Sequence, residues 1–189
     1  MKLLIVSGSS RQHSLNTTLA RCVAALHPDD EVRLDTDVPS LPFYDGDLEA
    51  AGIPGTVASV RAQVAAADRV VIVTHEYNRT VPGLLGNAVD WLSRPAGHSV
   101  LAGKPVLVLS ASPTHFGGVR AAEHLRGVLA RIGADVFPTG LSVAHAHQRL
   151  DEHPDAALMT ELAGLLMEFT ATVPRAMSKD LTTLEPLSA

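Results

Sequence analysis

The sequence is poor in cysteine, charge and long hydrophobic runs, and each shortage excludes a class of protein. Its 189 residues include one cysteine, Cys22, so the chain forms no internal disulfide and no paired-cysteine metal motif. Lys and Arg number 15 against 20 Asp and Glu and are scattered, unlike the clustered cations of nucleic-acid-binding proteins. The apolar runs at residues 70–74 and 105–109 are too short to cross a bilayer, and residues 3–6 are too short for a signal peptide. We therefore expect a cytoplasmic protein that binds neither nucleic acid nor a membrane.

The composition is that of a packed globular domain. Hydrophobic residues make up 46% of the chain, and a chain of this length buries roughly 70% of its extended surface. The sequence contains no internal repeat and no linker that would divide it. We expect one domain over residues 1–175 and a polar C-terminal tail over residues 176–189.

Two kinds of apolar pattern alternate along the chain. Short, nearly continuous apolar runs predict buried strands at residues 2–7, 69–74 and 105–110. A more polar strand is expected at residues 31–35, and a short fifth strand is expected to begin at residues 135–137. Apolar residues three and four positions apart predict helices near residues 15–26, 57–67, 82–94, 119–132 and 155–173. Residues 36–55 are expected to form a long loop, because they contain Pro39, Pro42, Gly46, Gly52 and Pro54.

This alternation predicts an α/β fold. Apolar strands that alternate with helices form a mostly parallel sheet with helices on both faces, linked by right-handed crossovers. We therefore expect a single doubly wound domain. In such sheets ligands bind beyond the carboxyl ends of the strands, so the loops to inspect are residues 8–14, 75–81 and 111–118.

The loop after the first strand is rich in hydrogen-bond donors. Between residues 7 and 18 it combines serines, threonines, Asn16 and Arg11 at the start of a helix. Free backbone N–H groups, the helix dipole and these side chains suit a phosphate, although helix capping also uses Ser and Asn. The sequence lacks the G-x-G-x-x-G and G-x-x-x-x-G-K-[ST] motifs, which disfavours a dinucleotide Rossmann site and a P-loop ATPase. We interpret this loop as a phosphate site.

A histidine group near residue 150 raises the question of a metal. His145, His147 and His153 lie close together in the sequence, but no carboxylate or thiol accompanies them at a known ligand spacing. We expect no metal site.

Four motifs resemble the NADPH-dependent FMN reductase family, in order over roughly residues 3–135. They are Gly8-Ser9-x-Arg11-x-x-Ser14-x-Asn16, Leu41-Pro42-x-Tyr44-x-x-Asp47-Leu48, the block from Glu76-Tyr77-Asn78 through Pro82-Gly83 and Asp90-Trp91 to Ser93-Arg94-Pro95, and Ser112-Pro113-x-x-x-Gly117-Gly118. Family members commonly have Pro where this chain has His75, and Lys where it has Gly86. The resemblance implies a flavodoxin-like fold with a five-stranded parallel sheet in the order 2-1-3-4-5.

The resemblance also assigns roles to particular residues. The phosphate of FMN would be held by Ser9, Arg11, Ser14 and Asn16. The isoalloxazine ring would lie along His75, Glu76, Tyr77, Asn78 and Arg79, mostly through their backbone groups. A third set, expected near N1 and the C2 carbonyl of the ring, consists of Ser112, His115, Phe116, Gly117 and Gly118. For the 2′-phosphate of NADPH, the candidate cations are Arg79, Arg94 and Arg120.

The expected activity is NAD(P)H-dependent FMN reduction. Hydride would pass from NADPH, or NADH, to bound FMN and on to a second small-molecule acceptor: free flavin, a quinone, an azo compound or a metal ion. Hydride transfer needs no obligatory acid–base residue, so catalysis would depend on stacking and distance. A flavodoxin-type electron carrier is the alternative; carriers of that kind are usually strongly acidic and aromatic-rich, whereas this chain has a net charge of −5 and 4% aromatics. A third possibility is a fold that has lost its flavin and serves as an interaction domain.

We further expect a homodimer or homotetramer. The resemblance implies one, with the helix at residues 82–94 near the interface. The same helix carries apolar side chains that cannot all face one sheet: Leu84, Leu85, Val89, Trp91 and Leu92.

Overall fold

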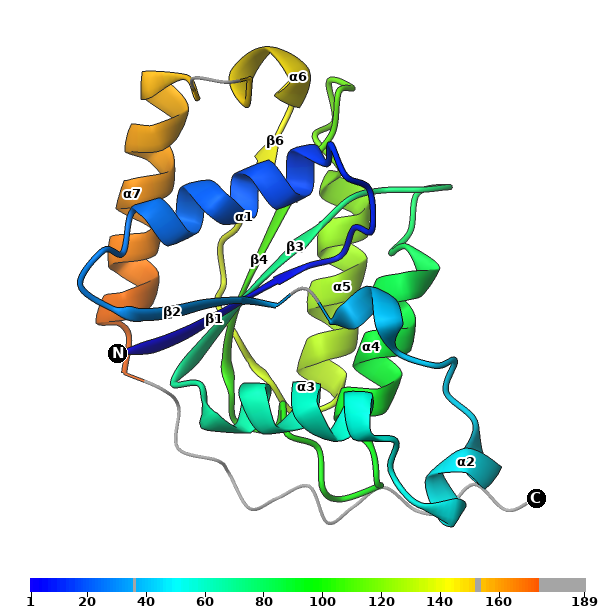
Figure 1. The fold of residues 1–189 in the computed structure, drawn as a ribbon. Helices are drawn as coiled ribbons and strands as arrows, with labels where there is room; N and C mark the ends of the chain where they lie inside the picture. Colours follow the sequence, from blue (N-terminus) through cyan, green and yellow to red (C-terminus); the bar gives the residue numbers. More distant parts are fainter. Residues whose placement is uncertain (36, 152–153, 174–189) are drawn as a thin grey trace.

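A parallel sheet forms the centre of the computed structural model, which describes residues 1–35, 37–151 and 154–173 (Figure 1). Its strands are β1 (Lys2–Ser7), β2 (Glu31–Asp35), β3 (Arg69–Thr74), β4 (Pro105–Ala111), β5 (Asp135–Val136) and β6 (Leu141–Val143). Five of them follow the order β2-β1-β3-β4-β5, and β6 pairs with β4. The predicted flavodoxin-like strand order is confirmed. The expected tail at residues 176–189 and His153 lie outside the described residues.

The sequence explains why β3 lies at the centre of the sheet. Every residue of this strand is buried, and it pairs with β1 from Leu3–Arg69 to Ser7–Val73 and with β4 from Val70–Val106 to Thr74–Ser110. Its β-branched side chains suit a strand that is covered on both faces. The loop that follows β3 is therefore flanked by the loops that follow β1 and β4.

The strand β6 was not predicted. Strand β5 ends after pairing Val136 with Val106, which leaves the carboxyl half of β4 without a neighbour on that side. Strand β6 covers this part, pairing Leu109 with Leu141 and Ala111 with Val143. The preceding Gly140 permits this approach, because a Cβ there would lie 2.5 Å from the Val108 carbonyl oxygen.

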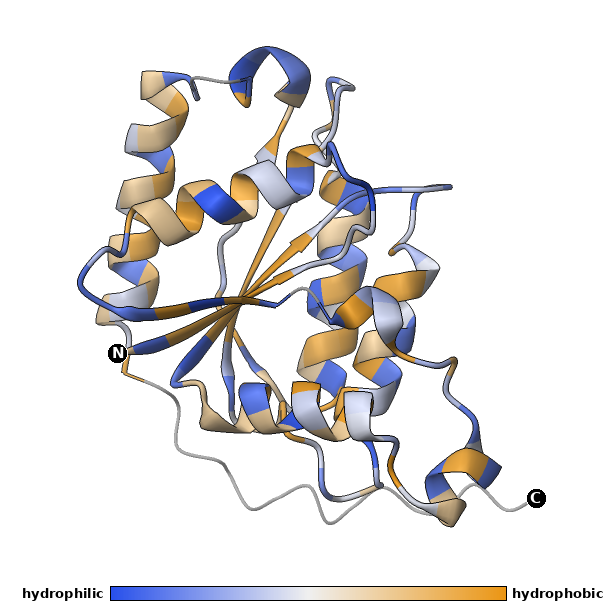
Figure 2. Cartoon of the chain, viewed as in Figure 1, coloured by the Kyte–Doolittle hydropathy of each residue, from blue (hydrophilic) through white to orange (hydrophobic). Residues whose placement is uncertain are grey.

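Helices cover both faces of the sheet, as predicted. On one side lie α1 (Leu15–Ala25) and α7 (Ala156–Ala171), together with the short α6 (Ala146–Arg149), which follows β6 (Figure 1). On the other side lie α3 (Gly55–Ala66), α4 (Gly83–Ser93) and α5 (Val119–Arg131). Alternate strand residues enter the two cores, so Val70 and Ile72 face α3–α5 whereas Val71 and Val73 face α1 and α7. Figure 2 shows the strands as the most hydrophobic part of the chain.

The predicted long loop at residues 36–55 is partly helical instead. It contains a 3-10 turn, η1 (Val38–Ser40), and the helix α2 (Gly46–Ala51). The side chain of Asp45 accepts hydrogen bonds from the N–H groups of Asp47 and Leu48, which starts α2, and Gly52 at φ 130° ends it. Pro39 lies within η1 and Gly46 begins α2, so these residues stand at helix starts that tolerate them, whereas Pro42, Gly52 and Pro54 lie outside the two elements.

This segment also covers the outer face of α4. The Trp91 indole donates to the Pro42 carbonyl at 2.8 Å, and the Asn87 side chain bonds to the backbone of both Pro42 and Tyr44. Leu85 and Trp91 are each only 1% exposed within a single chain. The use of this helix as evidence for a subunit interface was therefore wrong, and the homodimer or homotetramer stays a prediction.

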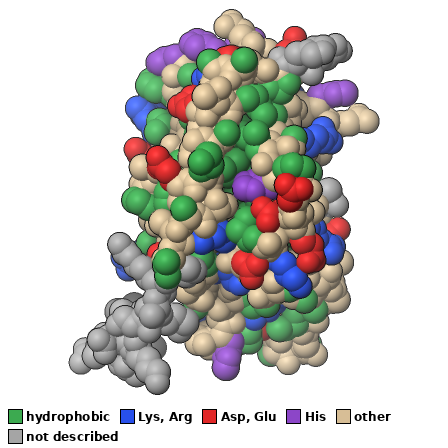
Figure 3. Space-filling view, turned by 90° about the vertical axis from the view of Figure 1, so that its left-hand side faces the viewer, with side chains coloured by type: hydrophobic (Ala, Val, Ile, Leu, Met, Phe, Trp, Pro, Cys, Tyr) green, Lys and Arg blue, Asp and Glu red, His purple; other side chains and the backbone are tan. Residues whose placement is uncertain are grey.

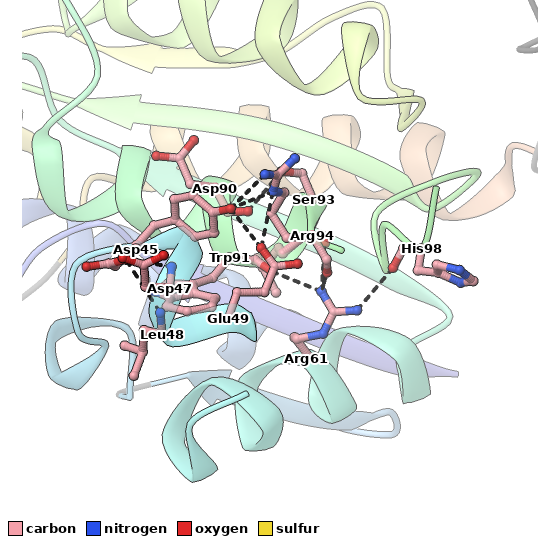
Figure 4. A network of polar contacts seen from close by, with 12 residues as sticks. Asp45, Asp47, Leu48, Glu49, Arg61, Asp90, Trp91, Ser93, Arg94 and His98 are labelled. Atoms are coloured by element: carbon pink, nitrogen blue, oxygen red, sulfur yellow. Dashed lines mark hydrogen bonds and ion pairs between the residues drawn. The ribbon is translucent and has the colours of Figure 1, made fainter. Parts of the chain in front are cut away.

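A polar network fastens α2 to the end of α4 (Figure 4). Arg94 donates to the Tyr44 hydroxyl from Nε at 2.9 Å and from Nη2 at 2.7 Å, and that hydroxyl donates to Glu49 at 2.7 Å. Arg61 donates to the carbonyls of Trp91 and His98 at 2.9 and 3.0 Å. Arg94 is thus engaged within the fold.

On the face seen in Figure 3, acidic and basic side chains lie close to one another. Among residues 1–35, 37–151 and 154–173, no helix is both long and apolar enough to cross a membrane.

Candidate functional site

Three loops meet in one pocket at the carboxyl edge of the sheet. The pocket has a volume of about 260 Å³, and its walls come from the loops after β1, β3 and β4 together with the first turn of α1. It is lined by Ser9, Arg11, Ser14, Leu15, Asn16, His75, Glu76, Tyr77, Ala111, Ser112, Pro113 and Thr114. A pocket of about 380 Å³ lies at the opposite edge, where β1 and β2 begin, away from these loops. The sequence rule that ligands bind beyond the carboxyl ends of the strands selects the first of these two.

The first loop presents donors at the start of α1. Ser14 is the N-cap, and its Oγ accepts from the Thr17 N–H at 3.3 Å while its own hydroxyl proton stays available to donate. The Ser9 hydroxyl accepts from the Arg11 N–H at 3.3 Å. No acidic residue lies in the first turn of α1. This end of the pocket therefore suits an anion, and Ser14 serves as a cap at the same time.

Asn16 lies in the same wall but has its amide engaged. Its Oδ1 accepts from the Ala111 N–H at 3.0 Å, and its Nδ2 donates to the Ala111 carbonyl at 3.2 Å. The residue is 5% exposed. Its side chain thus joins α1 to the end of β4.

The second loop contains a tight turn. Tyr77 and Thr80 exchange backbone hydrogen bonds at 3.0 and 3.3 Å, while Asn78 and Arg79 have φ values of 52° and 62°. Two successive positive φ values define a type I′ turn, and for Arg such a value is unusual and costs about 1 kcal/mol. Asn78 and Arg79, at the tip of the turn, are exposed and do not line the pocket, whereas Tyr77 does.

Glu76 and His75 have different environments in this loop. The Glu76 carboxylate accepts from the Ala121 N–H at 3.3 Å and so caps the first turn of α5. The His75 ring is half-buried and packs edge-on against Tyr77 with ring centres 4.5 Å apart; within the part of the chain that the structure describes, its Nδ1 has no hydrogen-bond partner. Burial lowers the pKa of His75, and the nearby Arg11 charge lowers it further. We therefore take His75 as neutral near pH 7.

One of the five third-loop residues predicted to contact the ring, Ser112, lines the pocket, and the contacts of all five with FMN stay a prediction. Ser112 lines the pocket, together with Pro113 and Thr114, whose N–H donates to the Ser112 hydroxyl at 3.2 Å. His115 and Phe116 are exposed, with ring centres 3.8 Å apart, and do not line it.

The two glycines of this loop have a packing role. Gly117 has a φ of 63°, and a Cβ there would lie 2.8 Å from the backbone of Ser142 in β6. Gly118, at φ 83°, is the N-cap of α5 and packs on Ser110. Contact with β6 and α5 explains both residues, and neither lines the pocket.

Several lining residues were missed by the sequence analysis: Leu15, Ala111, Pro113 and Thr114. Ala111, Pro113 and Thr114 follow β4, so the end of that strand was the signal that pointed to them. Leu15 was assigned only to the apolar face of its helix.

A smaller pocket of about 180 Å³ adjoins the first. It lies between the loop after β1 and the start of α4, and it shares four lining residues with the larger pocket: Ser9, Arg11, His75 and Tyr77. These four side chains therefore separate two neighbouring hollows.

Comparison with known proteins identifies the family. The family model described as NADPH-dependent FMN reductase matches residues 1–148. The chain is 38% identical over 152 residues to a 2-hydroxy-1,4-benzoquinone reductase of Burkholderia sp, covering 80% of this chain and 82% of that protein. It is 36% identical over 182 residues to a quinone reductase of Escherichia coli (strain K12), covering 93% and 96%.

A solved structure agrees with these relatives. The flavoenzyme NAD(P)H:(acceptor) oxidoreductase FerB from Paracoccus denitrificans superposes with a TM-score of 0.78 at 29% identity, covering 89% of this chain and 94% of that one. The strand order, the shared pocket and the matched residues lead to one conclusion. This chain belongs to the NADPH-dependent FMN reductase family and is an oxidoreductase.

Proposed function

We propose that this protein binds FMN in the pocket at the carboxyl edge of the sheet and uses NAD(P)H to reduce a small acceptor, with quinones as the favoured class. FMN and NAD(P)H are the cofactors that family membership supports. One observation carries the proposal: the hydrogen-bond donors of the first loop line the same pocket as residues of the loops after β3 and β4.

The donor set fits the phosphate of FMN. Ser9, Arg11 and Ser14 line the pocket at the start of α1, where backbone N–H groups and the helix dipole favour an anion. Arg11 supplies a permanent positive charge and the serines supply neutral donors. Ser112 and Thr114, from the third loop, also line the pocket, and their hydroxyls suit the polyol part of the cofactor.

The second loop is suited to the ring. His75, Glu76 and Tyr77 form the pocket wall at this loop; the Glu76 carboxylate accepts from the Ala121 N–H of α5, and burial lowers the pKa of His75. When bound, FMN would supply the acceptance and donation of hydride. The protein would then act by holding the ring and its partner at a fixed distance, for which no acid–base pair is needed.

Exposed aromatic rings favour a planar acceptor. Tyr77 is 55% exposed, and Phe116, on the third loop, is 48% exposed. Aromatic side chains stack on flat conjugated molecules, and the relatives from Burkholderia and Escherichia coli are named as quinone reductases. The exposed rings favour a planar organic acceptor over a metal ion, and the names of these relatives lead us to favour a quinone over free flavin or an azo compound.

Of the three arginines considered for the 2′-phosphate of NADPH, one is already bonded within the fold. Arg94 is bound to Tyr44 and Glu49, whereas Arg79 lies at the tip of the second loop and Arg120 lies 5.3 Å from the centre of the Phe116 ring. We infer that Arg79 or Arg120 fills this role.

Steady-state kinetics test the proposal. The purified protein is assayed for NADPH and NADH oxidation with 1,4-benzoquinone, free FMN, an azo dye or ferric citrate as acceptor. We expect the quinone to give the highest kcat/KM. Tight FMN binding without turnover of any acceptor would instead support a flavodoxin-type carrier.

The proposed assembly is a homodimer or homotetramer. Three aromatic rings are exposed in a single chain: Phe43, on the segment that covers α4, is 84% exposed, and Tyr77 and Phe116 are about half exposed. Exposed apolar side chains of this kind support an interface with another copy of the chain. Sedimentation velocity on the wild-type protein decides the assembly, and a monomer at micromolar concentration would contradict it.

A further inference from the structure

Asn16 makes a connection that the sheet itself does not provide. Strands β1 and β4 lie on opposite sides of β3, so no ladder hydrogen bond joins them. The Asn16 side chain, in the first turn of α1, bonds to both the N–H and the carbonyl of Ala111 at the end of β4, 95 residues away. It therefore ties the helix that follows the first loop to the start of the third loop.

The chemistry of this tie is specific to an amide. The carboxamide oxygen accepts from Ala111 at 3.0 Å while the nitrogen donates to Ala111 at 3.2 Å. A carboxylate in its place would accept the same N–H but would set its second oxygen against the Ala111 carbonyl. An apolar side chain would leave both backbone groups unpaired in a buried position.

Neighbouring bonds fix the two ends of the tie. At one end, the Ser7 and Thr17 hydroxyls are 2.9 Å apart, which anchors α1 on β1. At the other end, the Ser112 N–H donates to the Val143 carbonyl of β6 at 3.1 Å. The Asn16 bonds join these two anchored parts beside the pocket.

With both bonds to Ala111 made, the Asn16 amide keeps one N–H and one oxygen lone pair, in a residue that is 5% exposed. We propose that Asn16 is a positioning residue, whose two bonds to Ala111 set the spacing between the phosphate-binding first loop and the ring-side third loop. This inference rests on the proposed function and adds to the role that the family resemblance implied for Asn16.

Paired titrations of the apoprotein with FMN and riboflavin test the inference. The two ligands differ only in the phosphate, so the ratio of their Kd values isolates the phosphate contribution. For Asn16→Leu and Asn16→Ser, which add no charge beside the phosphate, we expect both Kd values, measured by flavin fluorescence, to rise by about tenfold; the rise for riboflavin, which lacks the phosphate, is the one that the positioning role requires. Arg11→Ala should weaken FMN binding alone.

Two controls separate positioning from a purely structural role. Thr160→Val removes a side-chain bond to the Ala156 carbonyl in α7, outside the pocket, and it should leave both Kd values within about twofold of wild type. Thermal unfolding of each apoprotein reports stability; should Asn16→Leu not fold, Asn16→Ser carries the comparison.

Each other outcome overturns the inference. A loss of FMN affinity with riboflavin affinity unchanged would show that Asn16 contacts the phosphate. A lower Tm with both affinities unchanged would show a purely structural role. A wild-type protein that binds neither flavin would contradict the proposed function, and this result is distinguishable because it needs no variant.

Discussion

The Glu76 carboxylate accepts a hydrogen bond from the Ala121 N–H at 3.3 Å, which fastens the loop after β3 to the first turn of α5. This relationship gives Glu76, which also lines the pocket, a role in the fold. It also connects the geometry of the candidate site to the stability of a helix.

Replacement of Glu76 should therefore affect stability. Glu76→Ala removes a helix cap and should lower the free energy of unfolding by about 1 kcal/mol, whereas Glu76→Gln keeps an acceptor and should lose less. Urea unfolding of the apoproteins measures the difference. Equal stability of Glu76→Ala and wild type would contradict the capping role.

His75 should make stability depend on pH. Its pKa in the folded protein lies below the ordinary value of 6.5, first because of burial and then because of Arg11. As the pH falls from 6.5 through the folded-state pKa, the unfolded chain binds more protons than the folded one, so stability is lost; above 6.5 this contribution is constant.

His75→Phe should flatten this dependence. The variant keeps an aromatic ring against Tyr77 but cannot titrate, so its free energy of unfolding should fall less than that of wild type between pH 7 and pH 5. His13→Gln, at an exposed position of the first loop, is the matched control. If His75→Phe and wild type change in parallel over this range, the burial argument is wrong.

Two glycines form a matched pair for substitution by alanine. Gly117 has a positive φ and a Cβ there would meet the Ser142 backbone at 2.8 Å, whereas a Cβ at Gly86, within α4, would have nothing within 4 Å. Gly117→Ala should destabilise by more than about 1 kcal/mol, and Gly86→Ala should stabilise by about 0.5–1 kcal/mol. Opposite signs of the two shifts in thermal unfolding are the expected result.

Leu85 distinguishes the core from an interface. Its side chain is 1% exposed and packs against Gly8, so Leu85→Ala should cost about 3 kcal/mol of unfolding free energy in a single chain. The assembly state of the folded variant should match wild type. A stable variant that only dissociates would restore this helix as a subunit interface.

Much of the fold was predictable from local patterns. The buried runs at β1, β3 and β4 and the three-and-four spacing of the helices indicated the parallel sheet, and the strand-end rule brought the three loops together. The parts that were missed depend on contacts between distant residues. Strand β6 has three residues and no period of its own, and α2 is held by Asp45 and by the Tyr44–Arg94 bonds across 50 residues.

The site was predicted in the same uneven way. Residue type was sufficient to select Ser9, Arg11 and Ser14, which line the pocket, because donors at a helix start suit an anion in any fold; their phosphate role stays a prediction. It was not sufficient for Asn16 or Gly117, whose partners, Ala111 and Ser142, are distant in sequence. Only three-dimensional contacts distinguish a ligand-binding amide from one that joins two loops.

The measurement that tests the account most directly is the affinity of the apoprotein for FMN and for riboflavin, in wild type and in the double variant Arg11→Ala with Ser14→Ala. We expect wild type to bind FMN more tightly than riboflavin, and the double variant to lose that preference while remaining folded. If wild type shows no preference for FMN, or if the double variant keeps it, the first loop does not hold the phosphate and the proposed site is wrong.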